Sequence, residues 1–279
     1  MSGARRFVKR MALAGAGAFA ARAVLGAVRG SPAAATLDRV NHRGAPVSLA
    51  AGPALAVAAS TTAAAGAGSP ALASAALVAG LGSGVVGLYD DVVGQRPDQK
   101  AAKGFKGHLA ALRDGSVTSG LVKVAGIGIS AMLAASLVGR ARRGDRPVTD
   151  LVIDTGLIAG AANLANLLDL RPGRALKAGI ALSGTLGATD SLLTGPSAAA
   201  AALLRDDLDE RVMLGDAGAN SFGALIGLAA ASRHGRTARL AMLAGIVGLT
   251  LASEKVSFTQ VIESTPVLRD LDGWGRRAR

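Results

Sequence analysis

Long uncharged blocks alternate with short charged segments along the chain. Val47–Ser69 and Ala71–Tyr89 contain no charged residue. Each is about as long as the roughly 20 residues that an α-helix needs to cross the hydrocarbon core of a bilayer. The pattern therefore predicts membrane-spanning helices that are joined by short polar loops.

Further blocks carry up to two charges. They are Met11–Val28, Ser116–Gly139, Pro147–Leu168, Ala178–Leu204, Ala217–Ser232 and Leu240–Ser253. The number of crossings is eight or nine, depending on whether Ala178–Leu204 crosses once or breaks into two short spans at Gly195 and Pro196. The blocks predict an all-α, polytopic integral membrane helical bundle of about 8–10 transmembrane helices, in a single domain over residues 1–279.

The N-terminal block follows a basic segment. Arg5 and Arg6, with Phe7 and Lys9, resemble a twin-arginine export signal. The motif spacing is one residue short, and no soluble domain follows. We therefore interpret residues 11–28 as a first membrane helix and not as a cleaved signal, and residues 254–279 as a cytoplasmic tail.

Composition narrows the class of protein. Half of the residues are hydrophobic and none is cysteine, which excludes intrinsic disorder, a disulfide scaffold and thiolate metal sites. Small residues let helices pack closely in lipid. The spacings of Gly80 with Gly84 and of Gly156 with Gly160 fit such packing, although an alanine-rich chain also produces them by chance.

The net charge of +12 suggests a polyanion or an anionic membrane surface as a partner. The basic residues are spread among short loops without aromatic stacking partners, so we predict no nucleic-acid binding. Loops on the side of Asp90 carry 18 Lys and Arg, against 11 on the other side. This bias predicts that the Asp90 side is cytoplasmic.

Acidic residues stand at the ends of three predicted spans. Asp90 and Asp91 follow one span, Asp169 follows another, and Asp216 precedes a third. Asp91 and Asp169 lie on one side of the membrane because two spans separate them. Asp216 shares that side only if Ala178–Leu204 crosses twice.

Carboxylates beside basic loops suggest Mg²⁺ and phosphate, because Mg²⁺ prefers a few carboxylate oxygens together with phosphate oxygens and water. Lys100, Lys103, Lys106 and His108 follow the Asp pair and supply cationic partners. Asp150 and Asp154 come just after Pro147, and we interpret them as residues that start a helix favourably, not as metal ligands.

The three acidic motifs resemble those of a known family. An Asp pair after a span, then Asn-x-x-Asp (Asn166 and Asp169), then Gly-Asp-x-Gly (Gly215–Gly218) occur in this order in the polyprenyl-phosphate N-acetylhexosamine-1-phosphate transferases of the MraY/WecA type, in glycosyltransferase family 4. The resemblance covers roughly residues 38–260. Arg43–Pro46 and Lys103–Phe105 are also similar to loops of this family.

The resemblance implies an Mg²⁺-dependent enzyme, with Mn²⁺ as an alternative ion. It would transfer a sugar-1-phosphate of the HexNAc or MurNAc-peptide type from a UDP-amino sugar to a polyprenyl phosphate, releasing UMP in cell-envelope biosynthesis. The active site would face the cytoplasm at the plasma membrane. Whether the protein forms a homodimer is left open. The resemblance implies a catalytic role for Asp90 and Asp91, a substrate-binding role for Lys103, Asn166 and Asp169, and a metal-binding role for Asp216. The basic loop residues Lys106 and Arg174 are added as substrate-binding candidates.

The chain also departs from the family pattern. Pro172 stands where the family has a further Asp, and Arg171, Arg174 and Lys177 make this loop more basic. A late histidine cluster is missing, and Glu254, Lys255 and Ser257 are the candidates for substitute contacts. Two alternatives therefore stay open: a catalytically impaired relative that binds a lipid carrier or a partner, and a transporter with acidic coupling sites.

Overall fold

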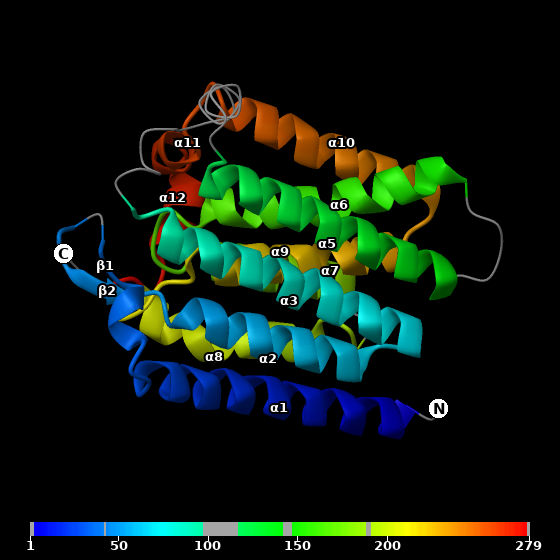
Figure 1. Ribbon diagram of the computed structural model, residues 1–279, viewed down its shortest axis with the longest axis horizontal. Helices are drawn as coiled ribbons and strands as arrows, with labels where there is room; N and C mark the ends of the chain where they lie inside the picture. The colour runs from blue at the N-terminus through cyan, green and yellow to red at the C-terminus, as the bar shows by residue number, and fades with distance from the viewer. Residues whose placement is uncertain (1–2, 42, 97–116, 142–146, 188–190, 278–279) are drawn as a thin grey trace.

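The computed structural model describes residues 3–41, 43–96, 117–141, 147–187 and 191–277. These residues form an all-α bundle whose long helices run side by side (Figure 1). The bounds of the helices are α1 (Gly3–Arg29), α2 (Ala51–Gly66), α3 (Pro70–Val93), α5 (Ser119–Ala141), α6 (Val148–Leu168), α7 (Arg174–Gly187), α8 (Thr194–Leu208), α9 (Gly215–Arg233), α10 (Arg236–Ser253), α11 (Phe258–Ser264) and α12 (Pro266–Gly273). The predicted fold class is confirmed.

Helix α9 forms the centre of the bundle, and α2, α3, α6 and α7 pack around it. Nearly all of its residues are buried. Its glycines allow this close approach: a Cβ on Gly223 would lie 2.4 Å from the backbone oxygen of Ala161 on α6. The small residues of the sequence therefore serve helix packing.

The two predicted glycine pairs also lie at helix contacts. Gly80 and Gly84 of α3 face α2, where a Cβ on Gly84 would lie 2.8 Å from the Cβ of Ala56. Gly156 and Gly160 of α6 face side chains of α10. In both pairs the spacing reflects close packing and not composition alone.

Four helices of the described residues are long and apolar enough to cross a membrane: α1, α3, α5 and α6. Helix α10 meets this standard only together with α11, from which it is bent by 94°. The count of four to five is lower than the predicted eight to ten. The physical reason is length for three of the helices, since α2, α7 and α8 have only 16, 14 and 15 residues.

Residues 178–204 belong to two helices, α7 and α8, as one of the two readings predicted. The break lies earlier than predicted, because Gly195 and Pro196 are already in the first turn of α8. The two helices pack against each other. The chain therefore returns to the end of the bundle at which α6 ends.

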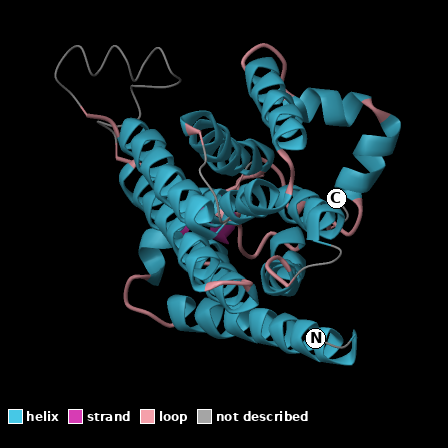
Figure 2. Ribbon diagram, turned by 90° about the vertical axis from the view of Figure 1, so that its right-hand side faces the viewer, coloured by secondary structure: helices cyan, strands magenta, loops and turns pink. Residues whose placement is uncertain are grey.

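One small sheet and the C-terminal helices complete this end. A short 3₁₀ helix (Ala34–Leu37) leads into β1 (Asp38–Val40), which pairs antiparallel with β2 (Pro46–Ser48). Ser48 also bridges to Val212, just before α9. Figure 2 shows how little of the chain is strand. Residues 254–277 are not a free tail, because they contain α11 and α12, and Asp272 of α12 contacts Arg174 of α7.

Candidate active site

Four acidic side chains from three distant segments meet at one end of the bundle. Asp90 and Asp91 lie in the last turn of α3, Asp169 caps the C-terminal end of α6, and Asp216 lies in the first turn of α9. Helices α3 and α9 meet closely, since a Cβ on Gly87 would lie 2.4 Å from the backbone oxygen of Asp216. The alternative in which residues 178–204 cross twice puts Asp216 on the side of Asp91 and Asp169, and the structure brings these acids to the same end of the bundle.

Asp91 holds the start of α9. Its Oδ1 accepts a hydrogen bond from the backbone N–H of Asp216 at 3.0 Å, and its Oδ2 accepts one from Ala217 at 2.9 Å. Gly215 is required next to it: its φ is +59°, and a Cβ would lie 2.8 Å from Asp91 Oδ1. Asp91 therefore satisfies amides that the helix start leaves unpaired, and its negative charge suits that end of the helix dipole.

Lys123 of α5 joins the other two carboxylates. Its Nζ lies 2.6 Å from Asp90 Oδ2 and 2.5 Å from Asp216 Oδ2. The sequence analysis did not assign a role to this residue. A signal for it existed, because Lys123 is the one charge in the block Ser116–Gly139, and an ionisable residue within a membrane segment is a functional candidate by default.

Asp169 lies within the electrostatic reach of the same cluster. Burial, followed by the negative charges of Asp207, Asp91 and Asp216, raises the pKa of Asp169 well above its ordinary value. The nearby backbone N–H of Gly215 acts in the opposite direction. The carboxyl groups of this cluster therefore act on one another electrostatically.

Asp207 of α8 is a further acid that the sequence analysis missed. Its Oδ2 accepts a hydrogen bond from the backbone N–H of Gly173 at 2.6 Å. Burial raises the pKa of Asp207 to about 7, against the lowering effect of that hydrogen bond. No sequence signal separated Asp207 from the charged run Arg205–Arg211 that contains it.

The remaining predicted residues fall in different places. Asn166 lies in the last turn of α6, where its backbone oxygen accepts from the N–H of Asp169 at 3.0 Å. Lys103 and Lys106 lie outside the described residues, as do Lys100 and His108. Among the substitutes for the histidine cluster, Ser257 caps α11 by accepting the N–H of Gln260.

Arg174 does not join the acidic cluster. Its guanidinium is buried and pairs with Asp272 through two hydrogen bonds, of 2.8 Å from Nε and 2.9 Å from Nη2. Its Nη1 donates to Thr259 Oγ1 at 3.0 Å. The donors of Arg174 are thus directed at the C-terminal segment, which differs from the substrate-binding role predicted for this residue.

Two cavities adjoin the acidic residues. A cavity of about 200 Å³ has a mixed lining, in which Asp169, Asp207, Glu210, Asn41 and Arg171 lie beside apolar residues such as Val47 and Val212. An apolar cavity of about 380 Å³ lies among α6, α7, α9 and α10. Its lining includes Leu168 and Leu214, the chain neighbours of Asp169 and Gly215. A cavity with acidic residues in its lining and an apolar cavity therefore both border this end of the bundle.

Mg²⁺ requires oxygen ligands in an octahedral arrangement. Within the described part of the chain, no group of three or more His, Asp or Glu side chains has the arrangement of a metal site. Mg²⁺ is commonly held by only one or two carboxylates, with substrate phosphates and water completing its octahedron. The carboxylates of Asp90 and Asp216, which already share one ammonium group, fit that requirement. The metal role of Asp216 stays a prediction.

No protein-family model matches the chain, and no curated protein is significantly similar to it.

Proposed function

We propose that this protein is a membrane enzyme that transfers a sugar-1-phosphate from a UDP-amino sugar to a polyprenyl phosphate. The observation that carries the proposal is the meeting of Asp90, Asp91, Asp169 and Asp216 at one end of the bundle, with Lys123 between Asp90 and Asp216, next to an apolar cavity. The same acids carry the resemblance to the transferase family in the sequence.

The charge of the cluster supports a divalent cation as cofactor. Four carboxyl groups and one ammonium repel a phosphate group at close range, unless a further positive charge lies between them. Mg²⁺, bound by Asp90 and Asp216, would neutralise the diphosphate of the donor and polarise its phosphoryl oxygens. Asp91 acts as a positioning residue in this proposal, because both of its oxygens accept backbone hydrogen bonds of α9.

The two cavities fit the two halves of a lipid phosphate reaction. The apolar cavity among α6, α7, α9 and α10 suits part of an isoprenoid chain. The smaller cavity, with Asp169 and Asp207 among its apolar lining, offers hydrogen-bonding groups to a nucleotide sugar. In the reaction, an oxygen of the lipid phosphate bonds to the sugar-linked phosphorus, and the bond from that phosphorus to UMP breaks with its electron pair on UMP.

The test is UMP release. The purified full-length protein, with Mg²⁺ and a polyprenyl phosphate, is expected to release UMP from at least one donor in a panel of UDP-HexNAc and UDP-MurNAc-peptide compounds. The Asp216→Asn variant should lose turnover while it still inserts and folds. An absence of UMP with every donor, or undiminished turnover of Asp216→Asn, contradicts the proposal.

A second candidate is a catalytically inactive relative that binds a nucleotide sugar or a lipid carrier. It is favoured by one observation: Lys123 already supplies a cation between Asp90 and Asp216, at the place where a metal would bind. This candidate predicts that a UDP-sugar binds with equal affinity with and without Mg²⁺ and is not turned over. The transferase predicts tighter binding with Mg²⁺ and release of UMP.

A further inference from the structure

The C-terminal helices turn away from the direction of the bundle. Helix α11 is bent by 94° relative to α10, and α12 follows one residue later. Helix α10 has 18 residues and is therefore about 27 Å long, close to the roughly 30 Å thickness of the hydrocarbon core. A chain that turns by a right angle at the end of such a helix continues along the boundary of the membrane.

Helix α12 exposes an apolar face. Val267, Leu271 and Trp274 are 68%, 62% and 72% exposed, and Leu268 is also exposed. Their spacing of four and three residues puts Val267, Leu271 and Trp274 on one side of the helix. Exposed apolar residues continue from the end of α10, through Leu249 and Leu251, to Val256 and Val261. The apolar surface of α12 is thus an extension of the outer surface of a candidate membrane span.

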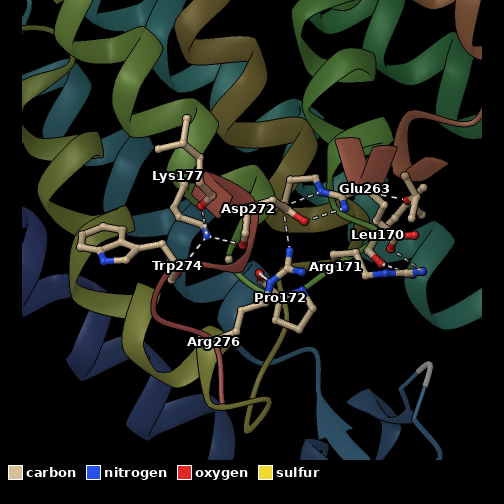
Figure 3. A network of polar contacts seen from close by, with 12 residues as sticks. Leu170, Arg171, Pro172, Lys177, Glu263, Asp272, Trp274 and Arg276 are labelled. Carbon is tan, nitrogen blue, oxygen red and sulfur yellow. Dashed lines mark hydrogen bonds and ion pairs between the residues drawn. The ribbon is translucent and has the colours of Figure 1, made fainter. Parts of the chain in front are cut away.

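The other face of α12 is fixed to the bundle by charged groups. Asp272 accepts two hydrogen bonds from Arg174, and Lys177 Nζ donates to the backbone oxygens of Leu271, Asp272 and Trp274 at 2.9, 2.6 and 3.1 Å (Figure 3). Lys177 therefore caps the carbonyl end of α12, where a positive charge is favourable. These contacts fix α12 against α7, and Leu268, Leu271 and Trp274, although exposed, also border a cavity between α12 and the bundle.

We propose that α11 and α12 form an interfacial anchor, defined as residues Phe258–Trp274, which lies in the headgroup region of the bilayer on the side of the acidic cluster. Val267, Leu271 and Trp274 insert at the boundary between headgroups and acyl chains. A helix with one apolar and one charged face is typical of this position, and the amphipathic indole of Trp favours the same region.

The segment just after the anchor reaches the loop that follows Asp169. Arg276 Nε donates to the backbone oxygen of Pro172 at 2.9 Å, and Arg276 Nη2 lies 2.7 Å from Asp272 Oδ1 (Figure 3). The basic residues Arg171, Arg174 and Lys177, which depart from the family pattern, follow the same acid. Two of them, Arg174 and Lys177, hold the anchor, so membrane contact and the position of this loop are linked.

Trp274 is the single tryptophan of the chain, so its fluorescence reports on the anchor alone. The full-length protein is reconstituted into phosphatidylcholine/phosphatidylglycerol vesicles whose acyl chains are brominated either near the headgroup or near the bilayer centre. We expect shallow bromines to quench Trp274 at least twofold more than deep ones, and aqueous iodide to quench it less than half as well as a free tryptophan amide. Iodide quenching equal to that of the free amide, equal quenching by both lipids, or protection from iodide without bromine quenching each overturns the anchor; the last result indicates a protein contact.

Two variants separate insertion from folding. Leu271→Glu changes a side chain that is 62% exposed, and it should raise iodide quenching of Trp274 about twofold and reduce quenching by shallow bromines. Asp272→Asn should act in the same direction through loss of the Arg174 pair, whereas Asp270→Asn, which changes an exposed acid of the same helix, should leave both quantities unchanged. Unchanged quenching in Leu271→Glu overturns the proposal. The measurement needs no substrate, so its failure is distinct from failure of the proposed transferase.

Discussion

The backbone N–H of Asp216 donates to the carboxylate of Asp91 at 3.0 Å, across 125 residues of sequence. The contact fixes the start of the central helix α9 against the end of α3, at the point where the other acids meet. Asp91 therefore determines the geometry of the cluster from a buried position, while Asp90 and Asp216 face Lys123.

Replacement of Asp91 should lower the free energy of unfolding of the protein. Asp91→Ala leaves the N–H groups of Asp216 and Ala217 without their acceptor, at a cost of about 1–3 kcal/mol per buried unpaired group. Asp91→Asn keeps one oxygen as acceptor and should lose about half as much. Titration with a denaturing detergent measures the free energy of unfolding.

The matched control for Asp91 is Asp270→Ala, at a carboxylate that is 73% exposed. It should change the free energy of unfolding by less than about 0.5 kcal/mol. Equal stability of Asp91→Ala and Asp270→Ala would show that the contact with α9 contributes nothing.

Lys123→Met should make the stability of the protein depend on Mg²⁺. The substitution removes the ammonium between Asp90 and Asp216 and leaves two carboxylates without a counter-charge. A cation that binds the folded state stabilises it by RT ln(1 + [L]/Kd), which is about 2.7 kcal/mol at 100 times Kd. Melting temperatures measured at rising Mg²⁺ should therefore increase more steeply for Lys123→Met than for the wild type.

Lys123→Arg keeps the positive charge and serves as the control for this series. Its melting temperature should follow that of the wild type as Mg²⁺ rises. A flat response of Lys123→Met over millimolar Mg²⁺ would speak against a cation site at Asp90 and Asp216.

The acidic motifs could be predicted from sequence because each stands at the edge of an apolar block. Their meeting point depended on whether residues 178–204 form one helix or two, and the charge pattern left that open. The predicted number of spans exceeds the four to five described helices that are long and apolar enough, because the apolar blocks include the short helices α2, α7 and α8. Helix α9 is almost entirely buried among other helices, a position that the sequence did not predict.

The sequence did not predict which residues form ion pairs with individual charged side chains. Arg174 could be assigned to substrate only because it stands near Asp169 in the chain, whereas its partner Asp272 lies 98 residues away. Such a pair is set by how the C-terminal segment folds back on α7. Lys123 was detectable by its isolation in an apolar block, but its two acidic partners come from other helices.

The buried carboxyl group of Asp207 should make the free energy of unfolding fall as the pH rises from about 4 to about 7. An unfolded Asp titrates near pH 3.9, while burial raises the pKa of Asp207 in the fold to about 7. Between these values the folded state binds more protons, so the stability present below pH 4 is lost on approach to pH 7, by at most about 1.4 kcal/mol per pH unit for one proton. Unfolding measured at pH 4.5, 6 and 7.5 reports the slope.

Asp207→Asn should flatten this slope while it keeps an oxygen for the N–H of Gly173. Asp209→Asn is the neighbouring control. The hydrogen bond from Arg205 lowers the pKa of Asp209, so this group titrates below the pH window. An unchanged slope in Asp207→Asn would assign the pH dependence to other acids, such as Asp169.

Arg239→Met should be among the most destabilising substitutions in the chain. The side chain of Arg239 is 3% exposed; it donates to Asp154, which is fully buried, and its Nη2 lies 3.0 Å from Asp150 Oδ1. The two acids after Pro147, predicted only to start a helix, thus form an ion-pair cluster between α6 and α10. Removal of the arginine leaves buried carboxylates without a counter-charge, at a cost of about 3–5 kcal/mol. Arg236→Met is the control: this half-exposed side chain lies 3.6 Å from Asp150, and its removal should cost less than about 1 kcal/mol. Detergent titration measures the free energy of unfolding of both variants and of Arg239→Met combined with Asp154→Asn. The added substitution should restore part of the lost free energy of unfolding. A further loss would show that Asp154 is not the carboxylate left unpaired.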